Sequence, residues 1–159
     1  MNNKRGEMTF IGIIIAIVII FLTFPITEYI SLQKRVDRTE RDIAIALSQE
    51  STAFSANMYD IYKNPSNTAM QDALKEKYKE RDILVTVLNA AGFEDTGENK
   101  YTNSSGCIID IDTCKLNYTF DNEYKITLKY TISCSFTILG ARVSVMDFEK
   151  CATAEIMKK

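Results

Sequence analysis

The hydrophobic pattern of the chain begins with a run of twenty uncharged, mostly apolar residues, 8–27, which has no polar face. At about 1.5 Å of rise per residue, a helix of this length covers about 30 Å, the thickness of the hydrocarbon core of a bilayer. A soluble helix of the same length would need a polar face. The run therefore predicts a transmembrane helix over 8–27, preceded by a short head, 1–7.

The next segment, 28–64, keeps a helical period and becomes amphipathic. After a charge-rich stretch, 37–42, apolar residues recur three, four or seven positions apart, at Ile43, Leu47, Phe54, Met58 and Ile61/Tyr62. This spacing places them on one stripe of a helix. We expect the stripe to pack on the protein's own core, with a coiled-coil seam as the alternative. The charge-rich stretch is polar all round and is expected to bridge through solvent.

Proline and glycine mark the ends of the helical patterns. Pro25, at the outer end of the apolar run, is expected to bend the helix without ending it. Pro65 stops the amphipathic pattern, and Ser66 or Asn67 can cap a second helix that runs to about Ala91, with a glycine just past its end. The segment 94–106 is rich in Asp, Asn, Ser and Gly and predicts a loop.

The last third of the chain changes to the period of two that is typical of strands. Residues 124–138 alternate strictly between apolar and polar, which predicts a long strand with one buried face. Residues 115–120 alternate before it, across a short polar hairpin loop. Residues 141–157 alternate after it, but their phase slips after Val145, which indicates a β-bulge. Residues 107–111 are a possible fourth strand.

The predicted fold class is therefore α+β. An N-terminal transmembrane helix extends into an amphipathic helix, and a second helix precedes a three- to four-stranded antiparallel sheet. In domain terms, the head is 1–7, the transmembrane helix 8–27, the amphipathic helical extension 28–64, and a small α+β domain 65–159. The helices are expected to cover one face of the sheet.

Composition argues against several functions. The net charge of −2 gives no electrostatic footprint for nucleic acid. Histidine, the commonest general base and metal ligand, is absent. No phosphate loop, nucleophile elbow or catalytic triad is evident, and the acidic residues Asp110, Asp112, Asp121 and Glu123 lack the pattern of a calcium loop. We therefore predict no enzyme activity, no metal or other cofactor, and no nucleic-acid or small-molecule partner.

All four cysteines lie in the last third of the chain: Cys107, Cys114, Cys134 and Cys151. An even number so far from the anchor favours disulfides and an oxidising compartment. A zinc site is the first alternative, but there is no C-x-x-C spacing and no histidine to complete one. Reduced, buried thiols are the second, and Cys134 fits because it occupies an apolar strand position. Three disulfide connectivities are open.

Two features bear on how the chain sits in a membrane. A cleaved secretory signal would share the basic start, but no small-x-small site follows the run. We therefore interpret the run as a retained anchor. Lys4 and Arg5 favour a cytoplasmic N-terminus, whereas the charge count after the anchor favours the reverse. Because the head is short and the cysteines need an oxidising compartment, we predict a single-pass cell-membrane protein with its C-terminal domain extracytoplasmic.

The order of these parts resembles that of type IV pilin-like proteins, most closely the TadE-like pseudopilins of the tight-adherence (Flp pilus) secretion system. The matching residues are Lys4-Arg5-Gly6, followed by Glu7-Met-Thr-Phe-Ile11 at the entrance to the apolar run. The likeness covers residues 1 to about 62 in pattern and the sheet in architecture only. It implies a processing site between Gly6 and Glu7. Where the family usually carries Glu five residues after the cut, this chain has Ile11.

Two classes of function follow. The resemblance implies a structural subunit of a secretion, adhesion or pilus-type assembly, with the lipid bilayer, other pilin-like subunits or assembly-platform membrane proteins as partners. Glu7, Gly12 and Pro25 are then the candidate helix-packing residues, since a small residue permits close approach of another helix and an acidic group near hydrocarbon tends to be functional. The alternative is a single-pass surface protein whose disulfide-linked sheet is a binding module.

We predict that the chain fractionates with membranes and resists extraction by high salt or carbonate, because twenty apolar residues outweigh any surface attraction. Ile17→Arg should cost about 2.5–3.5 kcal/mol of insertion free energy, measured as the inserted fraction in a translocon assay. Recovery of the unaltered chain in the soluble fraction would contradict the prediction.

Overall fold

The computed structural model describes residues 3–58, 79–119, 124–138 and 140–156. Helix α1, Asn3–Met58, runs as one element of 56 residues through the predicted anchor and most of the predicted extension, with Pro25 inside it. The helix is thus continuous past the proline, as expected. Residues 59–64, which the sequence also assigned to the extension, lie outside the described residues.

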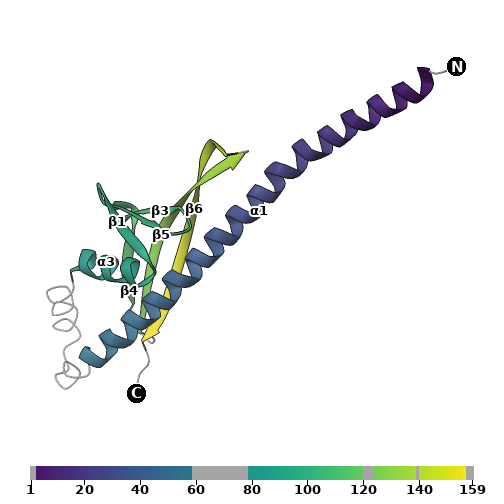
Figure 1. Cartoon of the computed structure of the whole chain (residues 1–159). Coiled ribbons are helices and arrows are strands. Elements are labelled where there is room, and N and C mark those ends of the chain that lie inside the picture. The colour runs from purple at the N-terminus through teal and green to yellow at the C-terminus, as the bar shows by residue number, and fades with distance from the viewer. Residues whose placement is uncertain (1–2, 59–78, 120–123, 139, 157–159) are drawn as a thin grey trace.

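The two halves of α1 have different surroundings (Figure 1). From residue 9 to residue 31 no side chain is buried. Beyond that point one stripe, with members mostly three or four positions apart, is buried: Leu32, Val36, Thr39, Ile43, Ala46, Leu47 and Ser51. Of the predicted stripe, Ile43 and Leu47 are buried, which confirms that this part of the helix packs on the protein's own core. The side chains of Phe54, Met58, Ile61 and Tyr62 lie outside what the structure describes. The expectation that residues 37–42 are polar all round and bridge through solvent is wrong, because Thr39 is 1% exposed.

Hydroxyl groups near the end of the anchor are satisfied by the helix itself. Thr23 Oγ1 donates to Ile20 O at 2.9 Å, and Thr27 Oγ1 donates to Phe24 O at 2.9 Å. Such bonds to carbonyls of the preceding turn let Ser and Thr lie in an apolar medium. These threonines therefore do not interrupt the apolar character of the run.

The C-terminal half of the chain forms one antiparallel sheet of six strands rather than the three or four predicted. The strands are β1 (Phe93–Gly97), β2 (Lys100–Asn103), β3 (Cys107–Asp110), β4 (Lys115–Thr119), β5 (Tyr124–Ile138) and β6 (Ala141–Ile156). The order is β1-β2-β3-β5-β4, and β6 also pairs with β5. A short 3₁₀ helix, η1 (Ile111–Thr113), links β3 to β4.

Strand β5 organises the sheet, as its long alternation predicted. It pairs with β4 from Lys125 to Lys129, with β3 from Ile132 to Cys134, and with β6 along its whole length. Its inward residues are buried against α1: Ile126, Leu128, Tyr130, Ile132 and Cys134. The three-strand meander β4-β5-β6 and the fourth strand β3 are therefore confirmed.

The prediction of a loop over 94–106 is wrong. This segment contains most of β1 and all of β2, which form a hairpin with positive φ angles at Gly97, Glu98 and Asn99. Only Phe93 and Tyr101 of the two strands are buried. With one inward residue per strand there is no alternation to recognise, and the polar, turn-forming residues dominate the sequence signal.

Helix α3, Glu80–Ala90, is the C-terminal part of the predicted second helix. It buries Ile83, Leu84, Val87 and Leu88 and contacts α1 and β1. Gly92 follows with a φ of 80°, as expected for a residue just past a helix end. Lys79 is extended, so one unbroken helix over 66–91 is wrong at that residue, and 66–78 lie outside the described residues.

The predicted β-bulge of β6 is present but lies nearer the hairpin. Phe136 pairs with Ser144 and Thr137 pairs with Arg142, so Val143 is the extra residue. The ladder is regular from Ser144 onward, so the phase slip that the sequence showed after Val145 reflects the outward position of the valines and not the bulge.

The buried stripe of α1 gives a matched pair of substitutions. Ile43 is fully buried, whereas Ile45, two residues away, is 52% exposed. Ile43→Ala should lower the free energy of unfolding by about 2–5 kcal/mol because it leaves a cavity, and Ile45→Ala should change it by no more than about 0.5 kcal/mol. Denaturant titration of the full chain in detergent micelles measures both. Equal losses would contradict the observed packing of α1.

Candidate functional site at the junction of anchor and sheet

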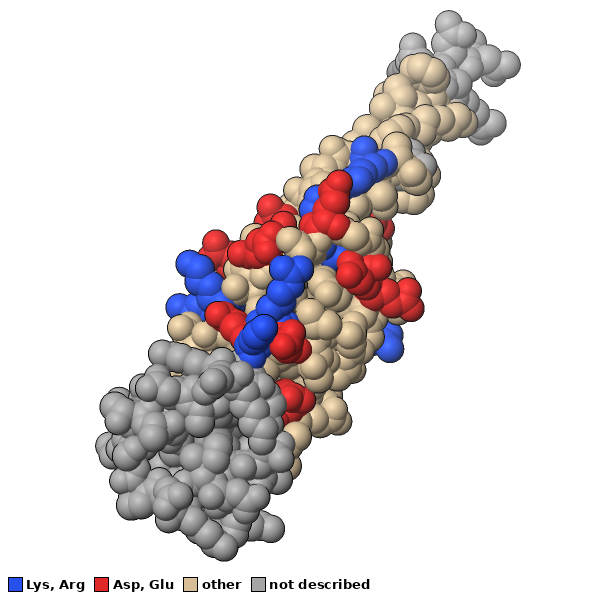
Figure 2. Space-filling view, turned by 90° about the vertical axis from the view of Figure 1, so that its left-hand side faces the viewer, with Lys and Arg blue, Asp and Glu red and all other residues tan. Residues whose placement is uncertain are grey.

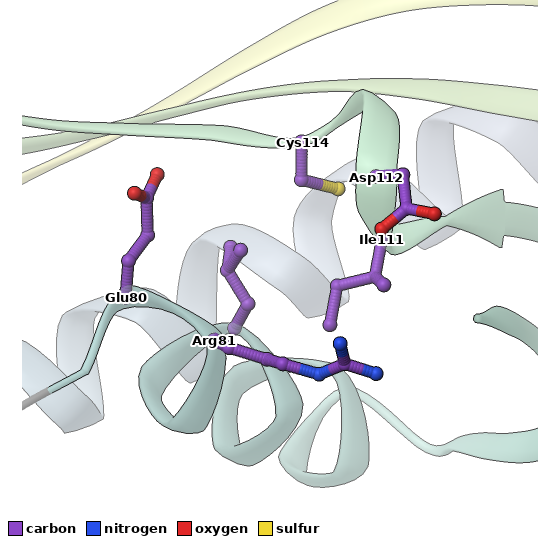
Figure 3. Close-up of a pocket in the computed structure, with 6 residues that line it drawn as sticks. Glu80, Arg81, Ile111, Asp112 and Cys114 are labelled. Carbon is purple, nitrogen blue, oxygen red and sulfur yellow. The ribbon is translucent and has the colours of Figure 1, made fainter.

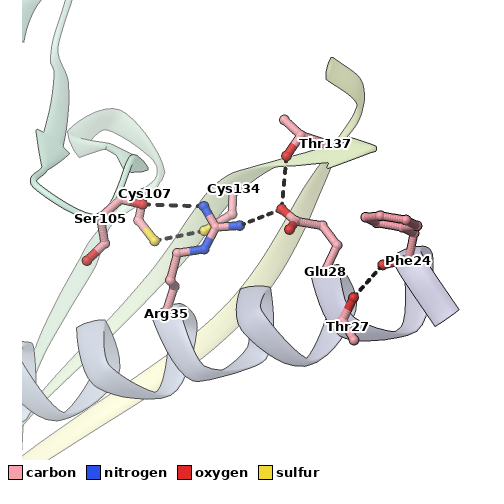
Figure 4. Close-up of polar contacts among 8 residues, drawn as sticks. All are labelled: Phe24, Thr27, Glu28, Arg35, Ser105, Cys107, Cys134 and Thr137. Carbon is pink, nitrogen blue, oxygen red and sulfur yellow. Dashed lines mark hydrogen bonds and ion pairs between the residues drawn. The ribbon is translucent and has the colours of Figure 1, made fainter. Parts of the chain in front are cut away.

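A polar cluster holds the sheet to α1 where the apolar run ends (Figure 4). Glu28 is the first charged residue after the run. Its Oε1 accepts a hydrogen bond from Thr137 Oγ1 at 2.9 Å and faces Arg35 Nη2 at 3.3 Å. Arg35 Nη1 donates to Ser105 O at 3.4 Å. The cluster thereby joins α1 to the end of β5 and to the turn between β2 and β3.

The ion pair in this cluster is better placed than a surface pair. The side chains of Glu28 and Arg35 are each 28% exposed, so water screens them less than it screens a fully exposed pair. Arg35 Nε is buried and has no hydrogen-bond partner among the described residues. Figure 4 shows the guanidinium group reaching Glu28 on one side and Ser105 on the other.

A second polar contact continues the junction one turn further along α1. Asn103 Nδ2 donates to Thr39 Oγ1 at 3.0 Å. Asn103 Oδ1 accepts from the backbone N–H groups of Ser105 and Cys107, both at 3.0 Å. One amide thus shapes the turn before β3 and docks that turn on the helix, leaving the buried Thr39 hydroxyl satisfied.

Cys107 and Cys134 lie side by side beneath the junction. They are directly opposite in the β3–β5 ladder, both are fully buried, and their Sγ atoms are 2.9 Å apart. The hydrogen bond from Cys134 lowers the pKa of Cys107 to about 6 against the opposing effect of burial, with help from Thr39 and the Arg35 charge. The same hydrogen bond, burial and the Cys107 charge raise the pKa of Cys134.

All four cysteines are free thiols in the structure, so none of the expected disulfides is formed. Of the possible cysteine pairs, the structure brings together Cys107 and Cys134. Cys114 is buried, and burial with the nearby Asp110 charge raises its pKa to about 12, so this thiol stays protonated at neutral pH. Cys151 is exposed on the outward side of β6. Cys114 thus lies in the interior and Cys151 on the surface.

A cavity of about 270 Å³ lies between α3 and the η1–β4 segment (Figure 3). Its charged and polar rim is already bonded within the chain. Arg81 Nη2 donates to Asn99 Oδ1 at 2.6 Å, and Asn99 Nδ2 donates to Asp112 Oδ2 at 3.0 Å. Glu80 Oε1 accepts from the backbone N–H of Leu116 at 2.9 Å. These bonds attach α3 to the sheet and leave no converging free groups for chemistry.

Charge on the domain is mixed. Figure 2 shows acidic and basic side chains interspersed on the viewed face, ending where the uncharged part of α1 begins. Among the described residues, no group of His, Cys, Asp and Glu side chains is arranged to hold a metal ion.

The candidate helix-packing and processing residues lie away from the junction. Gly6 and Glu7 belong to the first turns of α1. A Cβ atom placed on Gly12 would meet nothing within 4 Å in the part of the chain that the structure describes. Pro25 is half-buried near the cluster. The structure does not bring these residues together into one site.

Sequence reasoning missed Thr39 and Asn103. Asn103-Ser-Ser matches the glycosylation acceptor pattern, but in the structure the Asn103 side chain bonds to Thr39 and to the backbone of its own turn. The signals that were present are weak: Thr39 is four residues before Ile43 and three after Val36, on the buried stripe. An Asn three residues before Gly106 is also typical of a side-chain-capped turn.

The fold and junction define a class of protein: an α+β domain packed on the second half of a long helix whose first half is apolar and exposed. Within the described residues one helix is long and apolar enough to cross a membrane, and its apolar segment is not buried at all. No family model, curated protein or solved structure matches the chain.

The thiol pair yields a testable prediction. In an oxidising compartment Cys107 and Cys134 should form a disulfide, because their sulfur atoms need to approach by less than about 1 Å to reach bonding distance. A thiolate at Cys107 is the form that attacks a disulfide-bearing oxidase. Alkylation of denatured, unreduced protein followed by peptide mapping should modify Cys114 and Cys151 only. Modification of all four cysteines without reduction would contradict the prediction.

Proposed function

We propose that the protein is a membrane-anchored, pilin-like structural subunit that enters a secretion, adhesion or pilus-type assembly by packing its N-terminal helix. The observation that carries this proposal is the single helix α1, 56 residues long, with a bare apolar half and a half that is part of the domain core.

A simple tether would not need a helix that runs unbroken from the apolar segment into the domain core. The bilayer requires only apolarity of its anchor, and a flexible linker would present a binding domain equally well. Here the buried stripe starts at Leu32, five residues after the apolar run, and the Glu28–Thr137 and Arg35–Ser105 contacts clamp the sheet at the same level. The direction of the anchor therefore fixes the position of the domain. This coupling favours a subunit of an assembly in which packing of the N-terminal helix determines where the domain lies.

The N-terminal residues supply the proposed packing surface. A Cβ atom on Gly12 would meet none of the described residues within 4 Å, so its small size is available for another helix. Processing between Gly6 and Glu7 would remove Lys4 and Arg5 and leave Glu7 at the new N-terminus, next to hydrocarbon. The partners are other pilin-like subunits or assembly-platform membrane proteins in the same bilayer.

The proposed topology places the N-terminus in the cytoplasm and the sheet outside. The Cys107–Cys134 pair supports this orientation, since a buried pair at this distance is suited to an oxidising compartment. The chain is then a single-pass protein of the cell membrane.

Assembly through the helix predicts the effect of two substitutions. Glu7→Gln and Gly12→Leu should leave membrane insertion intact and lower crosslinking to partners. If each removes an interhelical contact of about 1–2 kcal/mol, the crosslinked yield falls by about 5- to 30-fold. Crosslinking in the native membrane followed by size analysis measures this, with Ile14→Leu as the matched control.

Two results would overturn the proposal. If both variants crosslink to the same partners as the parent chain, the helix is only a tether, and a surface protein with a binding module is the better interpretation. The mass of the mature N-terminus is a second, independent measure. A chain that starts at Glu7 supports the pilin-like subunit, whereas an intact chain that starts at Met1 favours the binding module.

A further inference from the structure

The end of the β5–β6 hairpin lies beside the last turn of the apolar run. Thr137, the next-to-last residue of β5, donates to Glu28 Oε1 at 2.9 Å, and Glu28 directly follows the run. Farther from the anchor, Lys150 Nζ lies 2.6 Å from Glu40 Oε2, and Lys150 pairs with Tyr130 of β5. From Tyr130 to Thr137, β5 therefore advances toward the anchor.

The hairpin continues in this direction beyond Thr137. Thr137 pairs with Arg142, and Ile138 pairs with Ala141. Since each strand residue adds about 3.3 Å, the pair Ile138–Ala141 lies one residue past the level of Glu28, toward the final turn of the run. Figure 1 shows the hairpin reaching back along α1 toward its N-terminal half.

The chemistry of β6 changes at this end. Among the residues outside α1 whose side-chain burial the structure describes, which leaves out Tyr124 and Ile156, the only exposed large apolar side chains are Val143 and Val145, at 58% and 47% exposure. Arg142, beside them, is also exposed. Farther from the anchor, the exposed odd-numbered positions of β6 are mostly polar or acidic: Asp147, Glu149, Cys151, Thr153 and Glu155. On β6 the exposed large apolar side chains that the structure describes thus lie only at the end nearer the anchor.

We propose that the end of the β5–β6 hairpin is a second membrane contact. Val143 and Val145 enter the interfacial region of the bilayer that holds the anchor, and Arg142 reaches the lipid phosphate groups. This inference rests on the anchoring part of the proposed function and not on assembly.

Three features favour lipid as the occupant. Val143 is at the level where the apolar run ends, and Val145, which pairs with Ser135, is about 7 Å farther from the run than Thr137, so the interfacial region of the bilayer is the surface nearest to them. The anchor makes their contact intramolecular, so even weak individual affinities suffice. An arginine beside apolar side chains suits the membrane–water interface, because its aliphatic stem can cover hydrocarbon while its guanidinium group binds lipid phosphate. Two contacts also prevent the domain from rotating about the axis of α1.

The experiment measures the depth of single nitroxide labels on the full chain in phosphatidylcholine nanodiscs, with and without phosphatidylglycerol. Cys151→Ser provides the background, because the other three cysteines are buried. Labels are placed by Val143→Cys or Val145→Cys, each of which keeps the other valine. Thr153→Cys, on the same strand far from the anchor, is the control.

At positions 143 and 145 the label should collide several-fold more with oxygen, which is lipid-soluble, than with a water-soluble nickel chelate, relative to the label at 153. Arg142→Gln should reduce this difference most in discs with phosphatidylglycerol. Chains retained in the discs with all three labels equally accessible to nickel would overturn this inference alone. Spin–spin broadening between labels at 143 would overturn it in favour of a second copy of the chain. Loss of the chain from the discs would overturn the anchoring proposal as well.

Discussion

The structure depends on one unbroken helix whose two halves have different surroundings. In its first half α1 is apolar on every side, and in its second half it carries a single buried stripe that begins at Leu32. No linker separates the halves, so an orientation imposed on the anchor is transmitted directly to the sheet. Because a helix of this length bends only gently unless a proline or a polar insertion intervenes, the contacts around Pro25 and Glu28 decide whether this coupling is rigid.

At the junction, polar side chains hold the sheet to α1 in addition to the apolar packing farther along the helix. Just outside a hydrocarbon region, an unsatisfied donor or acceptor in a packed interface would be costly. Glu28 meets both Thr137 and Arg35, while Thr39 meets the amide of Asn103. These bonds place the β2–β3 turn, and with it Cys107, against the helix. The thiol pair is thus a consequence of how the turn is docked as well as of the register between β3 and β5.

The parts of the fold that sequence predicted are those with long, regular patterns. The fifteen-residue alternation of β5 fits only a strand, and the apolar run is long enough to indicate a helix. The β1–β2 hairpin was missed because Phe93 and Tyr101 alone face inward. The pairing of Cys107 with Cys134 depends on β3 skipping β4 to pair with β5, a tertiary choice that local pattern does not encode. Thr39 was hidden by its charged neighbours, although its position on the stripe was visible.

The most direct test of rigid coupling is the distance across the junction in a bilayer. Ile19 and Ile45 are exposed on either side of it, at 55% and 52%, and can carry a pair of spin labels in a Cys151→Ser background. A continuous helix predicts one narrow distribution of distances near about 39 Å, from 26 residues at about 1.5 Å each. A broad distribution, or one centred at a clearly shorter distance, would show a hinge between anchor and domain and contradict the account.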